Sequence, residues 1–193
     1  MTNWPRLRLA VLVLAALVLL AVTLELGGRW AGRRISYTVS PASESAERVE
    51  LLAAAQRQAA PPLDFIDEAG RPHSLAEFRG RAVLVNIWAT WCPPCIAEMP
   101  DLDALQARLG GERFQVLAVS VDRAGAEVVA SWYQRRGLRN LAVYMADPAR
   151  AGAPLLPASM LVDAQGRIAW RGLGPFPWME PEVLAEIERL AAE

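Results

Sequence analysis

The sequence predicts an α/β domain in which helices cover a β-sheet on both faces, behind one membrane-spanning helix. An uncharged apolar run begins at Leu9. Beyond residue 60, short apolar runs typical of buried strands alternate with segments of helical spacing. The chain then continues with a strand–turn–strand pattern and an amphipathic helix, and such an order of elements indicates an α/β sheet.

The composition of the chain limits the classes of function open to it. The 193 residues are enough for one well-packed domain and an appendage. The 20 basic residues nearly balance the 21 acidic ones, whereas a nucleic-acid-binding domain is expected to carry a basic face. We therefore expect no nucleic-acid partner. All the basic residues are arginine, which excludes a mechanism with a lysine base or a lysine Schiff base.

Residues 1–28 are expected to form an uncleaved membrane anchor. The run from Leu9 to Leu24 contains no charge, and Arg8 and Glu25 at its ends can reach toward the membrane surface. Its effective length approaches the roughly 17–25 residues of a membrane helix, so we expect contact with the bilayer through residues 9–26. A cleaved signal peptide is the alternative, but the run exceeds the usual apolar core of about 7–15 residues and no convincing A-x-A site follows it.

Residues 29–60 are expected to form a tether. The stretch from Ile35 to Ser45 is polar and contains serine and proline. The segment from Ser45 to Ala59 is rich in helix-forming residues and predicts a short, solvated stalk helix. Two prolines then end the tether. We place the boundary near Ala60 and the folded domain at residues 61–193.

Seven segments of the folded domain have the pattern of β-strands. Two short ones within residues 63–75 flank a turn at Glu68–Arg71. The next two are mostly apolar, as expected of buried strands. A short strand follows, and then a hairpin turned at Ala164–Gly166. The five later strands are expected at Ala82–Ala89, Phe114–Val121, Leu141–Met145, Ser159–Asp163 and Arg167–Arg171.

Three segments of the folded domain have the pattern of helices. In the first, apolar residues recur every three or four positions. Gly137 ends the second, and Pro181 lies in the first turn of the third, where proline is tolerated. These helices are expected at Cys92–Leu109, Glu127–Arg136 and Glu180–Ala192.

The two cysteines of the chain, Cys92 and Cys95, are close together in the sequence. A bridge between them closes a very small loop and restricts the unfolded chain only slightly, which argues against a structural staple. A closed zinc site usually has four ligands, and the chain adds one distant histidine, His73, to the two thiols. A working redox pair is therefore favoured.

The predicted position of the cysteines suits disulfide exchange. Cys92 lies between a buried strand and the first turn of a helix, where unpaired N–H groups and the helix dipole stabilise a thiolate. Pro93 and Pro94 are tolerated because that turn needs no N–H donors. Cys95 lies one turn further along the same face, within disulfide reach. We expect Cys92 to attack a substrate disulfide and Cys95 to resolve the mixed disulfide.

The segment N-I-W-A-T-W-C-P-P-C-I-A-E-M-P, residues 86–100, resembles the active-site segment of the thioredoxin superfamily. More narrowly, it is similar to that of the TlpA/ResA-like, membrane-anchored thiol–disulfide oxidoreductases. The likeness includes the preceding hairpin, Ser120–Asp122 and Leu156–Asp163. It implies a thioredoxin-like fold with a central mixed β-sheet flanked by helices, an N-terminal β-hairpin and a helix–strand insertion near residues 125–145.

The resemblance also implies roles for individual residues. Pro157 matches the family's cis-proline, whose loop faces the dithiol and offers backbone hydrogen bonds to a bound substrate segment. Trp91 would form an aromatic wall beside Cys92, with plain packing as the alternative. Glu98 matches an active-site acid that would receive and return the protons of the thiols, with an exposed helix residue as the alternative. The catalytic residues implied are Cys92, Cys95 and Glu98, and the substrate-binding residues are Trp91, Pro93, Pro94, Leu156 and Pro157.

Two departures from the family's pattern matter. Thioredoxin itself has a buried aspartate six residues before the first cysteine, and this chain has Asn86 there, which does not titrate. Because Asn86 cannot act as the base, Glu98 becomes the stronger candidate for the proton acceptor. Between Met145 and Pro157 the chain is also shorter than its relatives, which have room for another helix there.

These observations predict a thiol–disulfide oxidoreductase held at the bacterial cytoplasmic membrane by a single span. The numbers of positive charges on the two sides of the span are nearly equal and do not decide its orientation. We therefore infer from the redox chemistry that the catalytic domain is periplasmic. We expect it to reduce oxidised envelope proteins, such as an apocytochrome c at its haem-attachment cysteines. A transmembrane electron-donor protein would keep it reduced. No metal, and no cofactor beyond the Cys92–Cys95 dithiol, is expected. Two alternatives stay open: a disulfide-forming oxidase, and a non-catalytic binding module or metallochaperone that uses the thiols as soft-metal ligands.

Overall fold

The computed structural model describes residues 49–193. The predicted membrane helix and most of the predicted tether lie outside these residues. Among the described residues, no helix combines the length and the apolar character needed to cross a bilayer.

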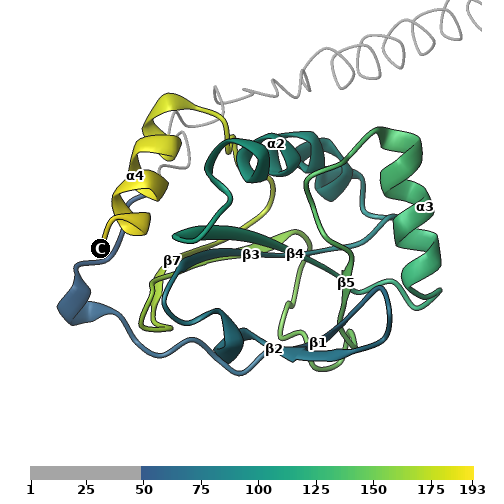
Figure 1. The fold of residues 1–193 in the computed structure, drawn as a ribbon, viewed down its shortest axis with the longest axis horizontal. Helices are drawn as coiled ribbons and strands as arrows, with labels where there is room; N and C mark the ends of the chain where they lie inside the picture. Colours follow the sequence, from purple (N-terminus) through teal and green to yellow (C-terminus); the bar gives the residue numbers. More distant parts are fainter. Residues whose placement is uncertain (1–48) are drawn as a thin grey trace, which may run out of the picture. The chain divides into compact units, whose positions relative to one another are not determined.

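A seven-stranded mixed β-sheet forms the centre of the domain (Figure 1). Its strand order is β2-β1-β5-β4-β3-β6-β7. β3 and β5 flank β4 and run parallel to it, and the other neighbouring strands are antiparallel. The expected mixed sheet and N-terminal hairpin are confirmed. The strands are β1 (Asp64–Asp67), β2 (Pro72–Ser74), β3 (Ala82–Trp88), β4 (Phe114–Ser120), β5 (Tyr144–Met145), β6 (Ala158–Val162) and β7 (Ile168–Leu173).

Three α-helices accompany the sheet, close to their predicted bounds. Gly137 follows the second of them in the left-handed conformation, which glycine adopts readily at the end of a helix. A proline occupies the first turn of the first and the last helix, as the sequence predicts. The helices are α2 (Pro93–Leu109), α3 (Ala126–Arg136) and α4 (Pro181–Ala191), with short 3₁₀ turns η1 (Ala54–Gln56) and η2 (Leu75–Phe78).

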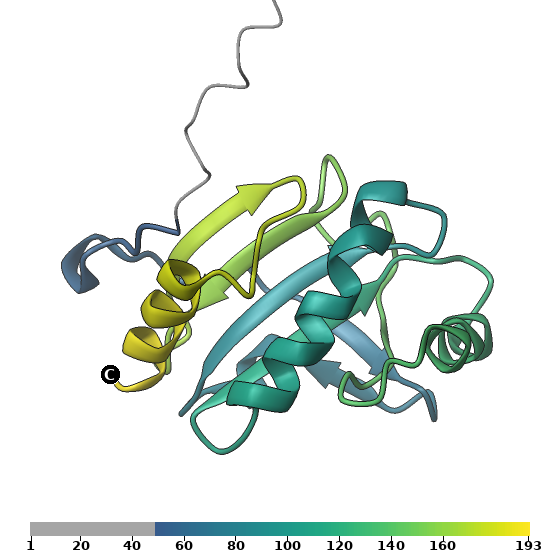
Figure 2. The same ribbon diagram turned by 90° about the horizontal axis from the view of Figure 1, so that it is seen from above.

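The described helices α2, α3 and α4 all lie on the same face of the sheet (Figures 1 and 2). Asn86 and Trp88 point to this face from β3, because side chains two positions apart in a strand share a face. Asn86 contacts Glu98 of α2, and Trp88 packs on Trp132 and Tyr133 of α3. The prediction of helices on both faces is therefore wrong. Its physical reason is the short connection between β5 and β6, which forms turns in place of a further helix.

On the opposite face of the sheet, residues 49–193 form an open groove and place no α-helix. The groove has a volume of about 660 Å³ and is lined by Val85 and Ile87 of β3 and by Met160 of β6. Residues 61–63 and 150–154 form its walls.

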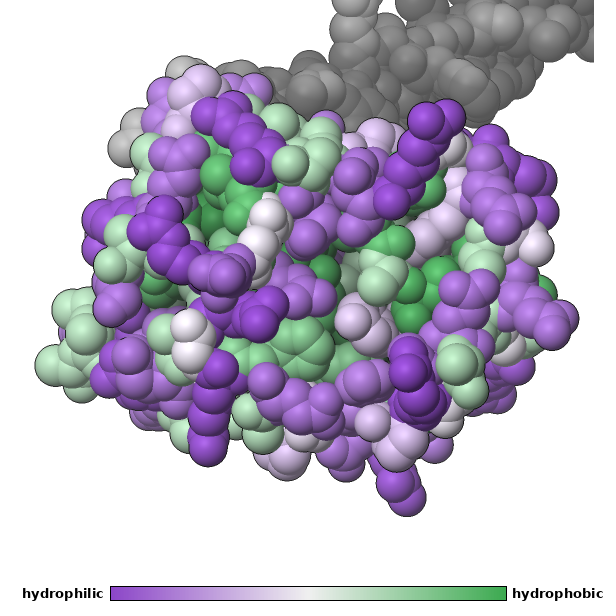
Figure 3. All heavy atoms as spheres, viewed as in Figure 1, coloured by the Kyte–Doolittle hydropathy of each residue, from purple (hydrophilic) through white to green (hydrophobic). Residues whose placement is uncertain are grey.

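In the view of Figure 1, polar residues cover most of the surface, and apolar residues form patches between them (Figure 3).

The described part of the predicted tether packs against the domain. The N–H of Leu52 donates to the carbonyl of Ala169 at 2.8 Å. Arg57 is buried and pairs with Asp163, at 3.3 Å, and with Glu193. In place of the expected stalk helix, residues 49–60 contain only the 3₁₀ turn η1 as helical structure. The structured domain therefore begins before Ala60. The residues before Ala60 make an ion pair and backbone hydrogen bonds with the domain, and their composition does not predict these contacts.

Strand β5 is shorter than predicted. The backbone N–H groups of Arg139, Asn140 and Leu141 all donate to Oδ1 of Asp103 on α2, at 3.0, 2.8 and 3.1 Å. These donors are thus satisfied by a side chain and form no strand ladder. Regular pairing begins at Tyr144.

Candidate active site

The junction between β3 and α2 places both cysteines. Cys92 is the N-cap residue of α2, and its Sγ accepts the backbone N–H of Cys95 at 3.4 Å. Pro93 and Pro94 follow in the first turn, where their missing N–H groups leave no gap in the helix. The Cys92 sulfur therefore lies where the helix dipole and a backbone donor both favour a thiolate over a thiol.

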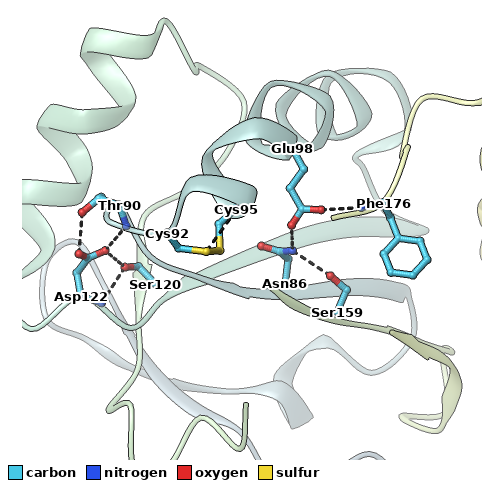
Figure 4. The surroundings of a disulfide bond; sticks show 9 residues. All are labelled: Asn86, Thr90, Cys92, Cys95, Glu98, Ser120, Asp122, Ser159 and Phe176. Carbon is cyan, nitrogen blue, oxygen red and sulfur yellow. Dashed lines mark hydrogen bonds between the residues drawn. A yellow bond between two sulfur atoms is a disulfide. The ribbon is translucent and has the colours of Figure 1, made fainter. Parts of the chain in front are cut away.

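Cys92 and Cys95 are joined by a disulfide, with their Cα atoms 5.3 Å apart. The bond spans the first turn of α2 (Figure 4). The exposed fraction of Cys92 is 5% and that of Cys95 is 0%. The predicted reach between the two thiols is confirmed, and their burial differs in the expected direction: an incoming molecule meets Cys92 first.

A groove of about 830 Å³ opens beside Cys92. Trp91, Pro93, Pro94 and Leu156 line it, four of the five residues expected to bind substrate. Trp91 is 65% exposed, which excludes the alternative of plain core packing. Because apolar side chains dominate these walls, the groove suits an extended polypeptide segment better than a small charged ligand.

The fifth expected residue, Pro157, lies behind the wall of this groove. The Leu156–Pro157 peptide bond is cis, as the resemblance implies. Pro157 itself is buried, and its carbonyl accepts the N–H of Gly174 at 2.8 Å. Of the pair, Leu156 is therefore the residue that faces a molecule in the groove.

Glu98 is a buried carboxylate and not an exposed helix residue. Its exposed fraction is 3%. Nδ2 of Asn86 donates to Oε1 at 2.7 Å. The Phe176 N–H and the Trp178 Nε1–H both donate to Oε2, at 3.1 and 3.0 Å. Burial raises the pKa of Glu98 above its usual value, although these three donors oppose the rise.

Asn86 lies between Glu98 and the disulfide. Its Nδ2 also donates to Ser159 Oγ at 2.9 Å, so both amide hydrogens point away from the sulfurs. Figure 4 shows its amide oxygen on the other side, directed toward the disulfide. Among the described residues, Glu98 bonds nitrogen donors alone. Asn86 supplies one of these donors, and its amide oxygen faces the sulfurs (Figure 4).

Asp122 holds the loop that leads into Cys92. Its Oδ2 accepts the Thr90 N–H at 2.9 Å, and its Oδ1 accepts the Thr90 hydroxyl at 2.7 Å. The hydroxyl of Ser120 donates to the same carboxylate at 2.7 Å. The backbone just before Trp91 is thereby fixed to the end of β4.

Sequence reasoning missed several of these contacts. Asp122 stood in the matching Ser120–Asp122 segment, and Ser159 at the start of a predicted strand, but nothing indicated their partners. Trp178 is buried and packs on Trp170, with 5.8 Å between their ring centroids. Its bond to Glu98 joins residues 80 positions apart, and no local pattern predicts such a pair.

His73 takes part in a separate cluster on the hairpin. It bonds Glu77 at 2.9 Å and Asp67 at 3.5 Å, and these carboxylates raise its pKa. In the described part of the chain, no group of three or more His, Cys, Asp and Glu side chains is arranged to hold a metal ion. The geometry around Cys92 and Cys95 is that of thiol chemistry: a sulfur at a helix start that borders a groove, a fully buried second sulfur and a buried acid on the same helix.

Comparison with known proteins agrees with this chemistry. Residues 55–187 match the Redoxin family. The thiol-disulfide oxidoreductase ResA of Geobacillus thermodenitrificans is 32% identical over 122 residues, which cover 62% of this chain and 70% of that protein. ResA of Geobacillus kaustophilus is 30% identical over 129 residues, with the same shares covered, 62% and 70%.

Solved structures show the same fold. A thiol:disulfide interchange protein of the thioredoxin family from Chlorobium tepidum superposes with a TM-score of 0.59 at 28% identity, covering 72% of this chain and 99% of that one. A secreted thiol-disulfide isomerase from Corynebacterium glutamicum gives a TM-score of 0.63 at 24% identity, covering 75% and 92%. The second likeness speaks for the fold alone. The chain thus belongs to the Redoxin family, and it is a thiol–disulfide oxidoreductase of the ResA/TlpA-like kind within the thioredoxin superfamily.

Proposed function

We propose that this protein reduces disulfides in proteins of the bacterial envelope. The observation that carries the proposal is the asymmetry of the Cys92–Cys95 pair at the start of α2. Cys92 borders an apolar groove, whereas Cys95 is fully buried on the side of Glu98. Such a pair can form a mixed disulfide through one sulfur and release it through the other.

The reaction uses the two thiols and Glu98 in turn. The Cys92 thiolate attacks one sulfur of the substrate disulfide, the substrate S–S bond breaks, and the other substrate sulfur leaves as a thiolate. Cys95 then loses its proton, which Glu98 takes up by way of a water molecule because Asn86 lies between the two groups, and the Cys95 thiolate attacks Cys92 Sγ. The second substrate sulfur leaves, and the Cys92–Cys95 disulfide remains. Two electrons have passed from the dithiol to the substrate.

Glu98 suits the acceptor role because its environment makes it easier to protonate than an exposed carboxylate. Three N–H donors stabilise the carboxylate, and burial disfavours it. The resulting rise in pKa brings the group closer to neutral pH, where a general acid–base is most effective.

Three further parts of the proposal concern location and partners. The apolar run Leu9–Leu24 supports a membrane anchor, with contact through residues 9–26. A tethered exchange dithiol is useful on the extracytoplasmic side, beside a membrane source of electrons. The substrate would be an oxidised envelope protein, for example an apocytochrome c with its two haem-attachment cysteines, and a transmembrane donor protein would reduce Cys92–Cys95 again.

Trapping tests this assignment. A Cys95→Ser variant, expressed in the native host, keeps the attacking sulfur but lacks the resolving one, so mixed disulfides with substrates should accumulate. Cys92→Ser is the matched control and should trap far less. Mass spectrometry should identify exported proteins with cysteine pairs. Equal trapping by the two variants, or trapping of cytoplasmic proteins alone, would contradict the proposal.

The direction of electron flow and the topology need separate measurements. Acid quenching followed by thiol labelling should find the wild-type pair mainly reduced in cells; a pair found mainly as the disulfide would favour the oxidase alternative. A reporter that works only outside the cytoplasm, fused after Glu193, should be active. A stable but inactive fusion would overturn the topology.

A further inference from the structure

The amide of Asn86 has one polar atom without a partner. Asn86 is 0% exposed, and its Oδ1 accepts no hydrogen bond from the described residues. Buried polar atoms are nearly always paired, so an exception calls for a physical explanation. Figure 4 shows this oxygen directed toward the disulfide, on the side of Cys95. A disulfide has no hydrogen to donate, whereas the reduced Cys95 thiol has one.

The orientation of the amide is fixed by its other neighbours. An ionised carboxylate only accepts hydrogen bonds, so Nδ2 of Asn86 must face Glu98, as the 2.7 Å contact shows. The Ser159 hydroxyl accepts the second amide hydrogen at 2.9 Å. The charge on Glu98 thus turns the amide oxygen toward Cys95.

We infer that Asn86 couples Glu98 to Cys95: its Oδ1 accepts the S–H of reduced Cys95 for as long as Glu98 is ionised. The inference rests on the proposed reaction, in which Cys95 loses a proton to Glu98. When Glu98 takes up that proton it becomes a donor, and the amide turns over to offer it Oδ1. Nδ2 then faces the Cys95 thiolate and donates to it. Ser159 suits both orientations, since a hydroxyl can donate or accept.

This coupling gives Asn86 two opposite effects during one turnover. Before the proton leaves, the amide oxygen holds Cys95 as a thiol and prevents premature attack on Cys92. After the proton reaches Glu98, the amide hydrogen stabilises the thiolate that must attack. The electron balance of the exchange is unchanged, because Asn86 moves neither an electron nor a proton of its own.

Other charges near this cluster do not replace the amide. Asp101, also on α2, raises the pKa of Glu98 by repulsion. The Cys92 thiolate is the other negative group of the reduced site, and Asp122 is occupied by Thr90 and Ser120. None of these side chains offers a donor to the Cys95 thiolate.

Substitution of Asn86 and Glu98, singly and together, tests the inference. Asn86→Leu has a similar shape and no acceptor. It removes the bond that stabilises reduced Cys95 and also the unpaired oxygen of the oxidised state, so both changes favour the disulfide. One hydrogen bond of ordinary net strength corresponds to about threefold to tenfold in an equilibrium constant. We expect the thiol–disulfide equilibrium with glutathione to shift toward the disulfide by about tenfold, which is about 30 mV for two electrons.

Glu98→Gln mimics the protonated acid, because its Nε2 is a hydrogen-bond donor and requires an acceptor, which Asn86 Oδ1 provides. We expect a shift of the same sign and similar size. If Asn86 transmits the effect, the double variant should lie within about threefold of the larger single effect, since residues that act as a unit are not additive. Ser159→Ala is the control: it removes a partner of Nδ2 but leaves Oδ1 in place, and should shift the equilibrium by less than about threefold.

An infrared measurement keeps the test independent of whether Asn86→Leu folds. In a Cys92→Ser background the S–H stretch belongs to Cys95 alone. The band should lie at lower frequency with Glu98 present than with Glu98→Gln, because only the first offers Oδ1 to the thiol. An unchanged band, or fully additive shifts in the redox equilibrium, would overturn the inference. The glutathione equilibrium involves no protein substrate, so these outcomes are separate from failure of the substrate assignment.

Discussion

Trp178 should control the protonation of Glu98. Its Nε1–H donates to Glu98 Oε2 at 3.0 Å, and the exposed fractions of the two residues are 0% and 3%. Phenylalanine keeps an aromatic ring but has no N–H donor. Trp178→Phe therefore leaves the carboxylate with the donors from Asn86 and Phe176 alone.

The size of the effect follows from the strength of the lost bond. A hydrogen bond to a charged group contributes about 1.5–3 kcal/mol, and one pKa unit corresponds to about 1.36 kcal/mol, so the pKa of Glu98 should rise by about one to two units. We expect the lower end, about one unit, because the N–H of Phe176 donates to the same oxygen and remains.

The same change predicts a pH-dependent loss of stability. Burial raises the pKa of Glu98 in the folded state, so folding favours the protonated acid and its stabilising contribution is lost as pH rises through the folded-state pKa. Trp178→Phe raises that pKa further. The difference in unfolding free energy between wild type and variant should therefore grow as pH rises through the folded-state pKa of the wild type toward that of the variant, because the unfolded-state pKa is the same for both. The loss from the smaller ring is constant with pH.

Two measurements check this reasoning. Carbon NMR of the labelled Glu98 carboxyl group gives its pKa, and urea denaturation at a series of pH values gives the stability. Trp170→Phe is the matched control, because Trp170 belongs to the same aromatic cluster but has no bond to Glu98. An unchanged Glu98 pKa in Trp178→Phe, or an equal shift in Trp170→Phe, would refute the argument.

Two further substitutions test the contacts that hold the site and the domain together. Asp122→Ala leaves the N–H and hydroxyl of Thr90 without their buried acceptor and should lower the unfolding free energy by about 2–4 kcal/mol in urea denaturation; a loss below about 1 kcal/mol would show that water replaces the carboxylate. Arg57→Met breaks the buried pair with Asp163 and should lower it by a similar amount, about 2–4 kcal/mol. Arg108→Met, in an exposed pair, should cost about 1 kcal/mol or less, and an equal effect of the two arginine variants would contradict the burial argument.

The elements that the sequence predicted well are those with a strong local signal. β3 is apolar apart from Asn86, and all seven of its residues are buried. The prolines after Cys92 mark a first helical turn, and α2 begins at Pro93. The cis-proline at position 157 came from the family resemblance, and the structure confirms the cis bond. The role of Pro157 in binding substrate stays a prediction.

The features that sequence reasoning missed depend on contacts between distant segments. The segment before Ala60 reads as a helix by composition, but Arg57 reaches Asp163 and Glu193, and the backbone follows those partners. Helices were expected on both faces because strands and helices alternate, yet alternation does not say which face each helix takes. Phe176 and Trp178 bond the buried Glu98 from the loop between β7 and α4, about 80 residues further along the chain.

The central claim is that Cys92 is the activated, attacking thiol of an exchange pair. The most direct test is to reduce the protein, alkylate it over a range of pH and map the adduct by mass spectrometry. We expect Cys92 to react first, with a pKa below the free-thiol value of about 8.5, because its sulfur lies at the start of α2 and accepts the Cys95 N–H. Modification of Cys95 before Cys92, or a Cys92 that titrates as a free thiol, would contradict it.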